Sequence, residues 1–478
     1  MCTVAPAMLM ARADAGRRLR ARARLPLIML AVLSLVSLGA RVALIGEPCQ
    51  SPCTLATDHV LIFDEAYYVN AARVIAGLRP PGGAHYANAP AGTDPNAEHP
   101  QLAKLIIAGS IELFGDGPLA WRLGSLVFGS LAILGMYALV RAAGGGSWLA
   151  LGASTLMATD NLLLVHARIG TLDVFVLTAM VWSLVLYLRG HPVLAGAVLG
   201  VGACFKLVAP YLVLVIVLIE ALRVLSGNPG YAGPRARLTR RAPARLGAFA
   251  LTAAVVFVGL LGVLDGIATP YDDAAAKLIT GGPFAHIAHM FSYAAHQSSP
   301  HGPQGIASYP WQWLADYKPI TYLRINPSHP GGGLYAVHPV SRFLGMISPP
   351  IMLLAVPSIL FAGWRIAVAW RRRRRARASL GGLGGKRAAV NLEPASELAI
   401  VGLAWSVGTF MPFELLSLIW SRTSYLYYMV IVMPGIYVAV AYLLSGARRW
   451  KATQGLAAIW GLAVLVAAVV MYPFTPLF

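Results

Sequence analysis

Apolar runs of about 20 residues recur along the whole chain, and they limit the possible folds more than any other feature. A helix needs about 20 apolar residues to cross the roughly 30 Å hydrocarbon core of a bilayer. The composition agrees, because 58% of the 478 residues are hydrophobic and only 12% are charged. Soluble domains carry about 25% charged residues. The sequence therefore predicts an all-α, polytopic membrane protein.

Eleven transmembrane spans account for the apolar runs. They lie at roughly 25–46, 118–140, 147–164, 170–188, 193–206, 207–222, 246–264, 348–370, 398–418, 424–444 and 454–472. The first run follows an Arg-rich N-terminus, as in a signal peptide, but it is too long and lacks a clear cleavage site. The alternative for the short pair is one long helix broken at Lys206 or Pro210. Merging the pair would place the basic run Arg371–Arg375 outside, so we expect two spans.

Clusters of basic residues separate the apolar runs. With the N-terminus in the cytoplasm, about two thirds of the 38 Lys and Arg residues fall in inner segments. The net charge of +19 therefore reflects membrane orientation and not a nucleic-acid partner. We expect a multi-pass protein of the cell membrane. Its parts are a cytoplasmic tail, 1–24; a transmembrane core, 25–264; a second outer loop, 265–347; and a C-terminal transmembrane region, 348–478, with a cytoplasmic basic loop at 371–397.

The first outer loop, 47–117, carries adjacent acids. Asp64 and Glu65 open the amphipathic stretch 60–77, and a second short amphipathic segment runs from His99 to Asp116. The second segment is too short to cross a bilayer, and we expect both to form helices in the membrane interface. The acid pair either serves as a proton acceptor, holds a divalent cation, or is merely solvated charge. Cys49 and Cys53 either form a disulfide or remain thiols.

Four further charged residues lie at the predicted outer ends of spans: Arg168, Asp173, Lys206 and Arg422. Charges at membrane depth are costly and usually functional, although Arg168 and Asp173 also have the alternative of a structural ion pair. This face suits a lipid-phosphate substrate, because Arg and Lys neutralise a phosphate leaving group. A carboxylate above it can deprotonate an attacking hydroxyl. The sequence contains no P-loop or dinucleotide fingerprint.

Several motifs resemble those of the protein O-mannosyltransferase family, of the GT-C class. In chain order they are Phe63-Asp64-Glu65-x-Tyr67, His99-Pro100-x-Leu102-x-Lys104, Phe114-Gly115-Asp116-x-Pro118-x-x-x-Arg122, Ala167-Arg168-x-x-x-Leu172-Asp173, Ser308-Tyr309-Pro310-Trp311-Gln312-Trp313, and the stretch 421–434. Together they cover most of the chain. Two positions depart from the family pattern, Gln101 and Leu314, where the family has Pro. No soluble domain interrupts the second outer loop, so the chain resembles bacterial members.

The resemblance implies a GT-C fold and an inverting transfer of mannose from polyprenyl-phosphate-mannose to Ser or Thr of an exported protein. Asp64 and Glu65 would be the catalytic residues, and Arg168, Lys206 and Arg422 would bind the donor phosphate. The remaining candidates would shape the site: His99, Lys104, Asp173, Trp311 and Trp313. No cofactor is required by this chemistry, and a divalent cation at Asp64 and Glu65 stays open.

Three alternatives to this function remain. The enzyme could transfer another lipid-phosphate sugar, or its acceptor could be a lipid or a cell-wall glycan. A transporter of a lipid-linked sugar would also need intramembrane charges, but transporters commonly contain internal repeats, and none is visible here. Trp311 and Trp313 either stack on a sugar or lie in the aromatic belt at the headgroups.

Overall fold

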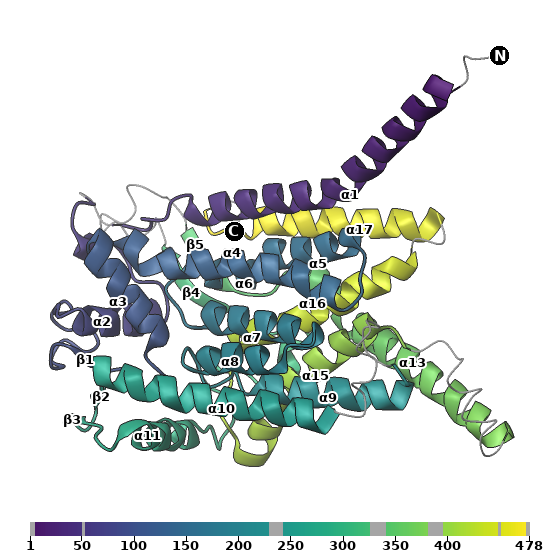
Figure 1. The fold of residues 1–478 in the computed structure, drawn as a ribbon. Helices are drawn as coiled ribbons and strands as arrows, with labels where there is room; N and C mark the ends of the chain where they lie inside the picture. The colour runs from purple at the N-terminus through teal and green to yellow at the C-terminus, as the bar shows by residue number, and fades with distance from the viewer. Residues whose placement is uncertain are drawn as a thin grey trace.

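The computed structural model describes residues 5–49, 53–228, 242–325, 341–380, 395–447 and 451–474, and these residues fold mainly into helices (Figure 1). Seven of the described helices are long and apolar enough to cross a membrane. They belong to α1 (Ala5–Val42), α4 (Pro118–Ala142), α10 (Ala242–Ile267), α13 (Pro349–Leu380), α15 (Glu397–Trp420), α16 (Met429–Ala447) and α17 (Lys451–Val470). The chain is therefore a multi-pass membrane protein.

The other four predicted spans correspond to shorter helices. These are α5 (Ser147–Thr159) with α6 (Asn161–His166), then α7 (Asp173–Leu188), α8 (Pro192–Ala203) and α9 (Tyr211–Ser226). At 1.5 Å per residue, the 16 residues of α7 extend only about 24 Å. Nearly all of its side chains are buried by neighbouring helices, so α7 need not match the lipid thickness. The count of eleven spans stays a prediction.

Close helix contacts in this core depend on small residues. The helices α8 and α10 meet at Gly196 and Gly200. A Cβ atom at these positions would lie 2.3 Å from the Phe249 carbonyl oxygen and 2.7 Å from the Ala253 carbonyl oxygen. Close backbone approach of this kind is typical of membrane helices, which gain packing contacts rather than hydrophobic burial.

Both predicted outer loops lie at the same end of the bundle, at the left of Figure 1. The first contains α2 (Glu65–Ile75), β1 (Thr93–Asp94) and α3 (Leu102–Phe114), and the second contains β2 (Thr269–Asp272), β3 (Lys277–Leu278), α11 (Gly282–His296), α12 (Pro310–Trp313), β4 (Ile320–Ile325) and β5 (Ser341–Gly345). β1 pairs in parallel with β2, while β4 and β5 form an antiparallel hairpin. Strand pairing thus joins the two loops.

Two local predictions need correction. The basic loop expected at 371–397 begins as a helix, because residues 371–380 continue α13, and α15 begins at Glu397. Residues 381–394, with Lys386 and Arg387, lie outside the described residues, as do Arg235, Arg237, Arg240 and Arg241. The helix within 60–77 begins at Glu65, as predicted, but it does not expose one polar face, since Glu65, Asn70 and Arg73 are buried with its apolar residues. Pairing of these polar groups makes their burial possible.

Candidate active site

Glu65 anchors the start of α2 through a carboxylate whose two oxygens each accept two hydrogen bonds. Oε1 accepts hydrogen bonds from Arg122 Nε at 2.8 Å and from the Gly170 amide at 2.7 Å. Oε2 accepts from Arg122 Nη2 at 2.8 Å and from the Ile62 amide at 2.8 Å. Both Glu65 and Arg122 are fully buried. The first outer loop is therefore fixed to α4 and to the segment that precedes α7.

Asp64 differs from its neighbour. It occupies the N-cap position of α2 but makes no side-chain capping bond, and within the described part of the chain no group donates a hydrogen bond to its carboxylate. Burial raises the pKa of the Asp64 carboxyl to about 7; the charge of Lys206 opposes this shift and that of Asp173 adds to it. A half-buried carboxylate with a pKa near neutrality is suited to act as a general base.

The residue before Asp64 helps to set this geometry. Phe63 has a positive φ of 55°, which is unusual for an aromatic residue. Its ring stacks on Tyr322 of β4, with centroids 4.0 Å apart and planes inclined by 14°, and it meets Tyr427 edge-on. The backbone turn at Phe63 thus places a ring on the second outer loop while α2 begins at the next residues.

Asp173 and Lys206 form an ion pair beside these rings. Lys206 Nζ lies 2.7 Å from Asp173 Oδ1, and both side chains are buried. Asp173 begins α7, and Lys206 lies between α8 and α9. The ammonium group also lies 5.3 Å and 5.6 Å from the ring centroids of Tyr427 and Tyr428. Asp173 and Lys206 therefore meet from two separate elements, and the charges of both act on Asp64.

Arg168 points to a different place. Nη1 and Nη2 donate to the Ala40 and Leu44 carbonyl oxygens at 3.3 Å and 2.7 Å, and the guanidinium lies 4.7 Å from the Phe474 ring. The structural ion pair with Asp173, considered as an alternative, is not formed, because Asp173 is paired with Lys206. Arg168 instead joins the end of α1 to the residues after α17.

The remaining cations, Arg422 and Lys104, act on His99. Arg422 donates through Nη1 to the Ala294 carbonyl oxygen of α11. Burial, together with the charges of Lys206, Lys104 and Arg422, holds the pKa of His99 well below its usual range. His99 is therefore neutral, and the three cations that act on it come from three separate segments of the chain.

Lys104 stabilises the loop that carries His99. Its ammonium group is fully buried, 2.6 Å from Asp94 Oδ2, and donates to the carbonyl oxygens of Asn96 and His99 at 2.5 Å and 2.9 Å. Although buried lysines are costly, this one is fully paired. Lys104 therefore contacts only residues 94–99 of the first outer loop through the bonds named here.

The two tryptophans have different surroundings. Trp313 is fully buried, donates from Nε1 to Ser308 Oγ at 2.9 Å, and packs against Phe413 and Tyr428. Trp311 is 43% exposed and stacks on Tyr309. Only Trp313 reaches the aromatic group around Lys206.

Four residues of this site were not singled out from the sequence for a site role: Arg122, His166, Tyr322 and Tyr427. Arg122 appeared in a motif without a role, and its charge near a span was the available signal. His166 Nε2 lies 2.8 Å from the Tyr322 hydroxyl. No spacing in the sequence connects these two residues, which are 156 positions apart.

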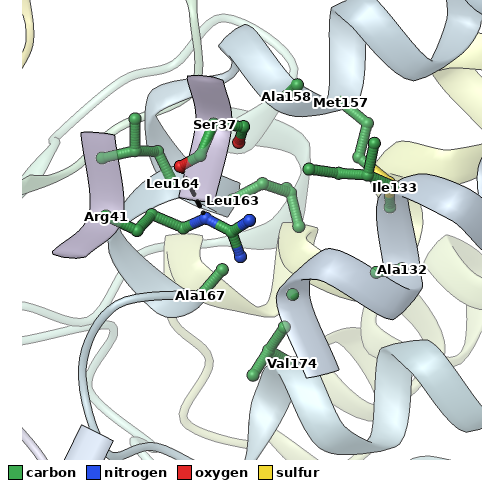
Figure 2. A pocket seen from close by; sticks show the side chains of 11 residues that line it. Ser37, Arg41, Ala132, Ile133, Met157, Ala158, Leu163, Leu164, Ala167 and Val174 are labelled. Atoms are coloured by element: carbon green, nitrogen blue, oxygen red, sulfur yellow. Dashed lines mark hydrogen bonds between the residues drawn. The ribbon is translucent and has the colours of Figure 1, made fainter. Parts of the chain in front are cut away.

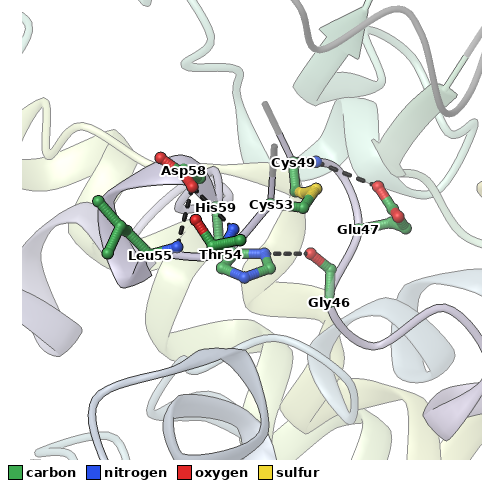
Figure 3. The surroundings of a disulfide bond; sticks show 8 residues. All are labelled: Gly46, Glu47, Cys49, Cys53, Thr54, Leu55, Asp58 and His59. Carbon is green, nitrogen blue, oxygen red and sulfur yellow. Dashed lines mark hydrogen bonds between the residues drawn. A yellow bond between two sulfur atoms is a disulfide. The ribbon is translucent and has the colours of Figure 1, made fainter. Parts of the chain in front are cut away.

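The residues present do not fit a divalent cation at the acid pair. Each Glu65 oxygen already accepts two hydrogen bonds, so it would have to lose Arg122 or a backbone amide to bind a metal. Asp64 alone offers too few ligands. A group of Glu47, Cys49 and Cys53 lies close together elsewhere, but the two cysteines form a disulfide (Figure 3).

Two apolar cavities lie among the helices of the bundle. One, of about 200 Å³, lies between α13, α15 and α16 and is lined by Leu314, Val407, Phe410 and Ile436 among others. The second, of about 360 Å³, lies between α4, α7, α8 and α10 and includes Val198 and Phe205. Phe410 contacts Trp313, so the first cavity adjoins the aromatic group around Lys206.

A third pocket lies behind the site and is unsuited to a substrate (Figure 2). Its internal space is about 10 Å³, which is room for one water at most. Arg41 extends into it and donates to the Ser37 and Leu126 carbonyl oxygens and to Ser130 Oγ. The pocket therefore serves to accommodate a buried structural cation.

Comparison with known proteins gives a family match and a similar fold. Residues 98–259 match the family described as Dolichyl-phosphate-mannose-protein mannosyltransferase. A Corynebacterium glutamicum protein named polyprenol-phosphate-mannose–protein mannosyltransferase is 35% identical over 129 residues, which cover 26% of this chain and 24% of the relative. The match thus spans about a quarter of that relative's length.

The fold comparison covers nearly the whole chain. The Pmt1–Pmt2 protein O-mannosyltransferase complex of S. cerevisiae, bound to the sugar donor, superposes with a TM-score of 0.66 over 95% of this chain and 90% of that one, at 13% identity. This likeness confirms the all-α membrane fold of the GT-C type. The resemblance to the same family is confirmed over residues 98–259, whereas the motifs outside that range stay predictions.

Proposed function

For a chain that resembles the protein O-mannosyltransferases in fold and in residues 98–259, we propose transfer of mannose from polyprenyl-phosphate-mannose to a Ser or Thr hydroxyl of an exported protein. The observation that carries this proposal is the approach of an unbonded carboxylate, Asp64, to a buried cation, Lys206, at the predicted outer end of the bundle. The sugar and the acceptor class follow from the resemblance alone.

In the proposed reaction, Asp64 accepts the proton of the acceptor hydroxyl as its oxygen attacks the anomeric carbon. The bond from that carbon to the phosphate oxygen breaks, and the configuration inverts. The leaving group is polyprenyl phosphate, whose new negative charge is stabilised by the Lys206 ammonium group. Glu65 holds the start of α2 and does not share the role of base, because all its acceptor positions are filled.

The other cations support the phosphate less directly. We assign Arg422 a second phosphate contact, since its charge acts on His99 together with that of Lys206. Arg168 would set the position of the segment that contains His166 and Asp173, because its own contacts are with the ends of α1 and α17. Lys104, His99, Trp311 and Trp313 would shape the site.

The donor's isoprenoid tail would occupy the apolar cavity between α13, α15 and α16. This cavity has no polar surface and adjoins Trp313. Trp313 contacts Tyr428, whose ring in turn lies beside the Lys206 ammonium group. Filling it should weaken donor binding. We expect Val407→Trp to raise the KM for the donor, whereas Val198→Trp, a half-buried valine in the second cavity, should leave it unchanged.

The acceptor would approach from the water-exposed side of α2. Tyr67, three positions after Asp64, is 40% exposed and stacks on His85. We place this face outside the cell membrane with the N-terminus in the cytoplasm, as the basic clusters predict. The division into a tail, 1–24, a core, 25–264, a second outer loop, 265–347, and a C-terminal region, 348–478, is part of this proposal.

A turnover assay on the full chain in proteoliposomes tests the function. We expect labelled mannose on a Ser/Thr peptide and release of free polyprenyl phosphate from polyprenyl-phosphate-mannose. Labelled lipid or glycan in place of peptide would point to another acceptor. Movement of intact donor across the bilayer, with no phosphate released, would show a transporter and reject the proposed reaction.

A further inference from the structure

His166 lies at the junction of the two outer loops and the charged pair. It ends α6 and is fully buried. Its Nε2 lies 2.8 Å from the Tyr322 hydroxyl of β4, while its Nδ1 lies 3.2 Å from Thr171 Oγ1 and 3.7 Å from Asp173 Oδ2. A single side chain thus contacts the second outer loop on one side and the partner of Lys206 on the other.

The neighbours determine which ring nitrogen carries the proton. Asp173 Oδ2 is buried and has no hydrogen-bond partner among the described residues, and a carboxylate can only accept. A proton on Nδ1 therefore faces Thr171 and Asp173. Nε2 then accepts the hydrogen bond that the Tyr322 hydroxyl donates. The side-chain contacts therefore run in one direction, from the Tyr322 hydroxyl through the His166 imidazole to the Asp173 carboxylate, which is paired with Lys206.

Packing holds Tyr322 in the position that these contacts need. Its ring stacks on Phe63, the residue before Asp64, and His166 stacks on Tyr427 at 5.8 Å. Gly345 of β5 leaves room for the Tyr322 ring, since a Cβ at that position would lie 2.3 Å from Tyr322 Cζ. Tyr322 therefore contacts the segment of Asp64 with its ring and the segment of Asp173 with its hydroxyl.

We propose that His166 and Tyr322 are positioning residues that couple the second outer loop to the Asp173–Lys206 pair and so align Lys206 with Asp64. The inference rests on the proposed function, because alignment matters where one group accepts a proton and the other receives a phosphate charge. If β4 were displaced, the Tyr322 hydroxyl would no longer bind His166 Nε2. The imidazole could then turn away from Asp173 Oδ2, so that Asp173 would lose its second neighbour besides Lys206. The site would then be assembled only when the loop is seated.

Two variants and their combination test the coupling. Tyr322→Phe removes only the hydroxyl, and His166→Ala removes the acceptor. We expect either change to lower kcat about tenfold, the value of one lost hydrogen bond, and the double variant to lower it by little more than tenfold. Tyr187→Phe is the matched control, since it also loses a buried hydroxyl, which lies 2.9 Å from Glu220, away from the site. It should match wild type in kcat.

A structural role alone would not produce this pattern. If Tyr322→Phe matches Tyr187→Phe in kcat, or if the double variant loses about 100-fold, the coupling is rejected. Hydrogen exchange supplies a readout without turnover: Tyr322→Phe should speed exchange at 166–173 and at 320–325, and Tyr187→Phe should not. Unchanged exchange at 166–173 rejects the coupling even in an inactive protein. Inactivity of wild type towards every polyprenyl-phosphate sugar rejects the proposed function instead.

Discussion

Replacing Asp64 by Asn should lower activity and raise stability at the same time. The substitution keeps the shape of the side chain and removes its capacity to accept a proton. Loss of a general base typically lowers a rate by about 10²- to 10⁴-fold. Because Asp64 accepts no hydrogen bond in the described structure, Asn breaks no existing contact there.

The stability gain follows from the pKa of the carboxyl, which is raised from 3.8 to about 7. A raised pKa means that the folded state binds the proton more tightly than the unfolded chain, so the stability that this group contributes is lost as the pH rises from about 4 to about 7. At about 1.4 kcal/mol per pH unit, the loss between pH 5 and pH 8 is roughly 3 kcal/mol. Asn does not titrate, so the variant avoids this loss.

Two measurements decide the matter. Thermal unfolding in detergent at pH 5 and pH 8 should show that the advantage of Asp64→Asn over wild type grows with pH. The wild-type kcat/KM should rise with pH through about 7 and then level off, because the base must be deprotonated. A variant that keeps more than a tenth of the activity, or one that is less stable than wild type at pH 8, would refute the assignment of Asp64 as a base with a raised pKa.

Three further predictions concern neighbouring groups. Glu65→Gln leaves the buried Arg122 without its anion and should destabilise the protein by about 3 kcal/mol in thermal unfolding; an unchanged midpoint would contradict the anchoring role. Lys206→Met should weaken binding of polyprenyl phosphate about 10- to 100-fold by titration, whereas the exposed Lys277→Met should not; equal affinities would remove Lys206 from the phosphate site. Gly129→Ala would place a Cβ 2.3 Å from Arg41 Nη1 and 2.4 Å from Ala167 Cβ, so it should lower the free energy of unfolding by about 1–3 kcal/mol. Gly109 has open space around it, and Gly109→Ala should be neutral or stabilising. Similar melting temperatures of the two variants would refute the packing argument.

Features with a local or periodic cause were predictable from the sequence. The long spans follow from runs of apolar residues, and the start of α2 follows from the acid pair at its head. The predicted topology places the outer ends of separate spans on one face, and the pairing of Asp173 with Lys206 agrees with it, whereas Arg168 contacts the ends of α1 and α17 instead. These predictions required only the order of the segments.

Features that depend on side-chain direction were not predictable. Asp64 and Glu65 are adjacent, yet successive residues of a helix start point about 100° apart, so one carboxylate is bound by Arg122 and the other remains unbonded. Arg168 and Asp173 are five positions apart, yet they face different neighbours. The contact of Tyr322 with His166 depends on the return of a long loop, which periodicity does not report.

The attachment of Glu65 to Arg122 and to the Gly170 amide makes the distance between base and cation a property of the rigid bundle. A hydroxyl acceptor on a mobile chain can adjust to that spacing, whereas the donor, held by its lipid in the membrane plane, cannot. Under the proposed function, we therefore expect the site to select donors by the height of the headgroup above the membrane. A sugar linked through a diphosphate would carry its anomeric carbon one phosphate too far from Lys206, and it should be rejected even when sugar and tail are the preferred ones.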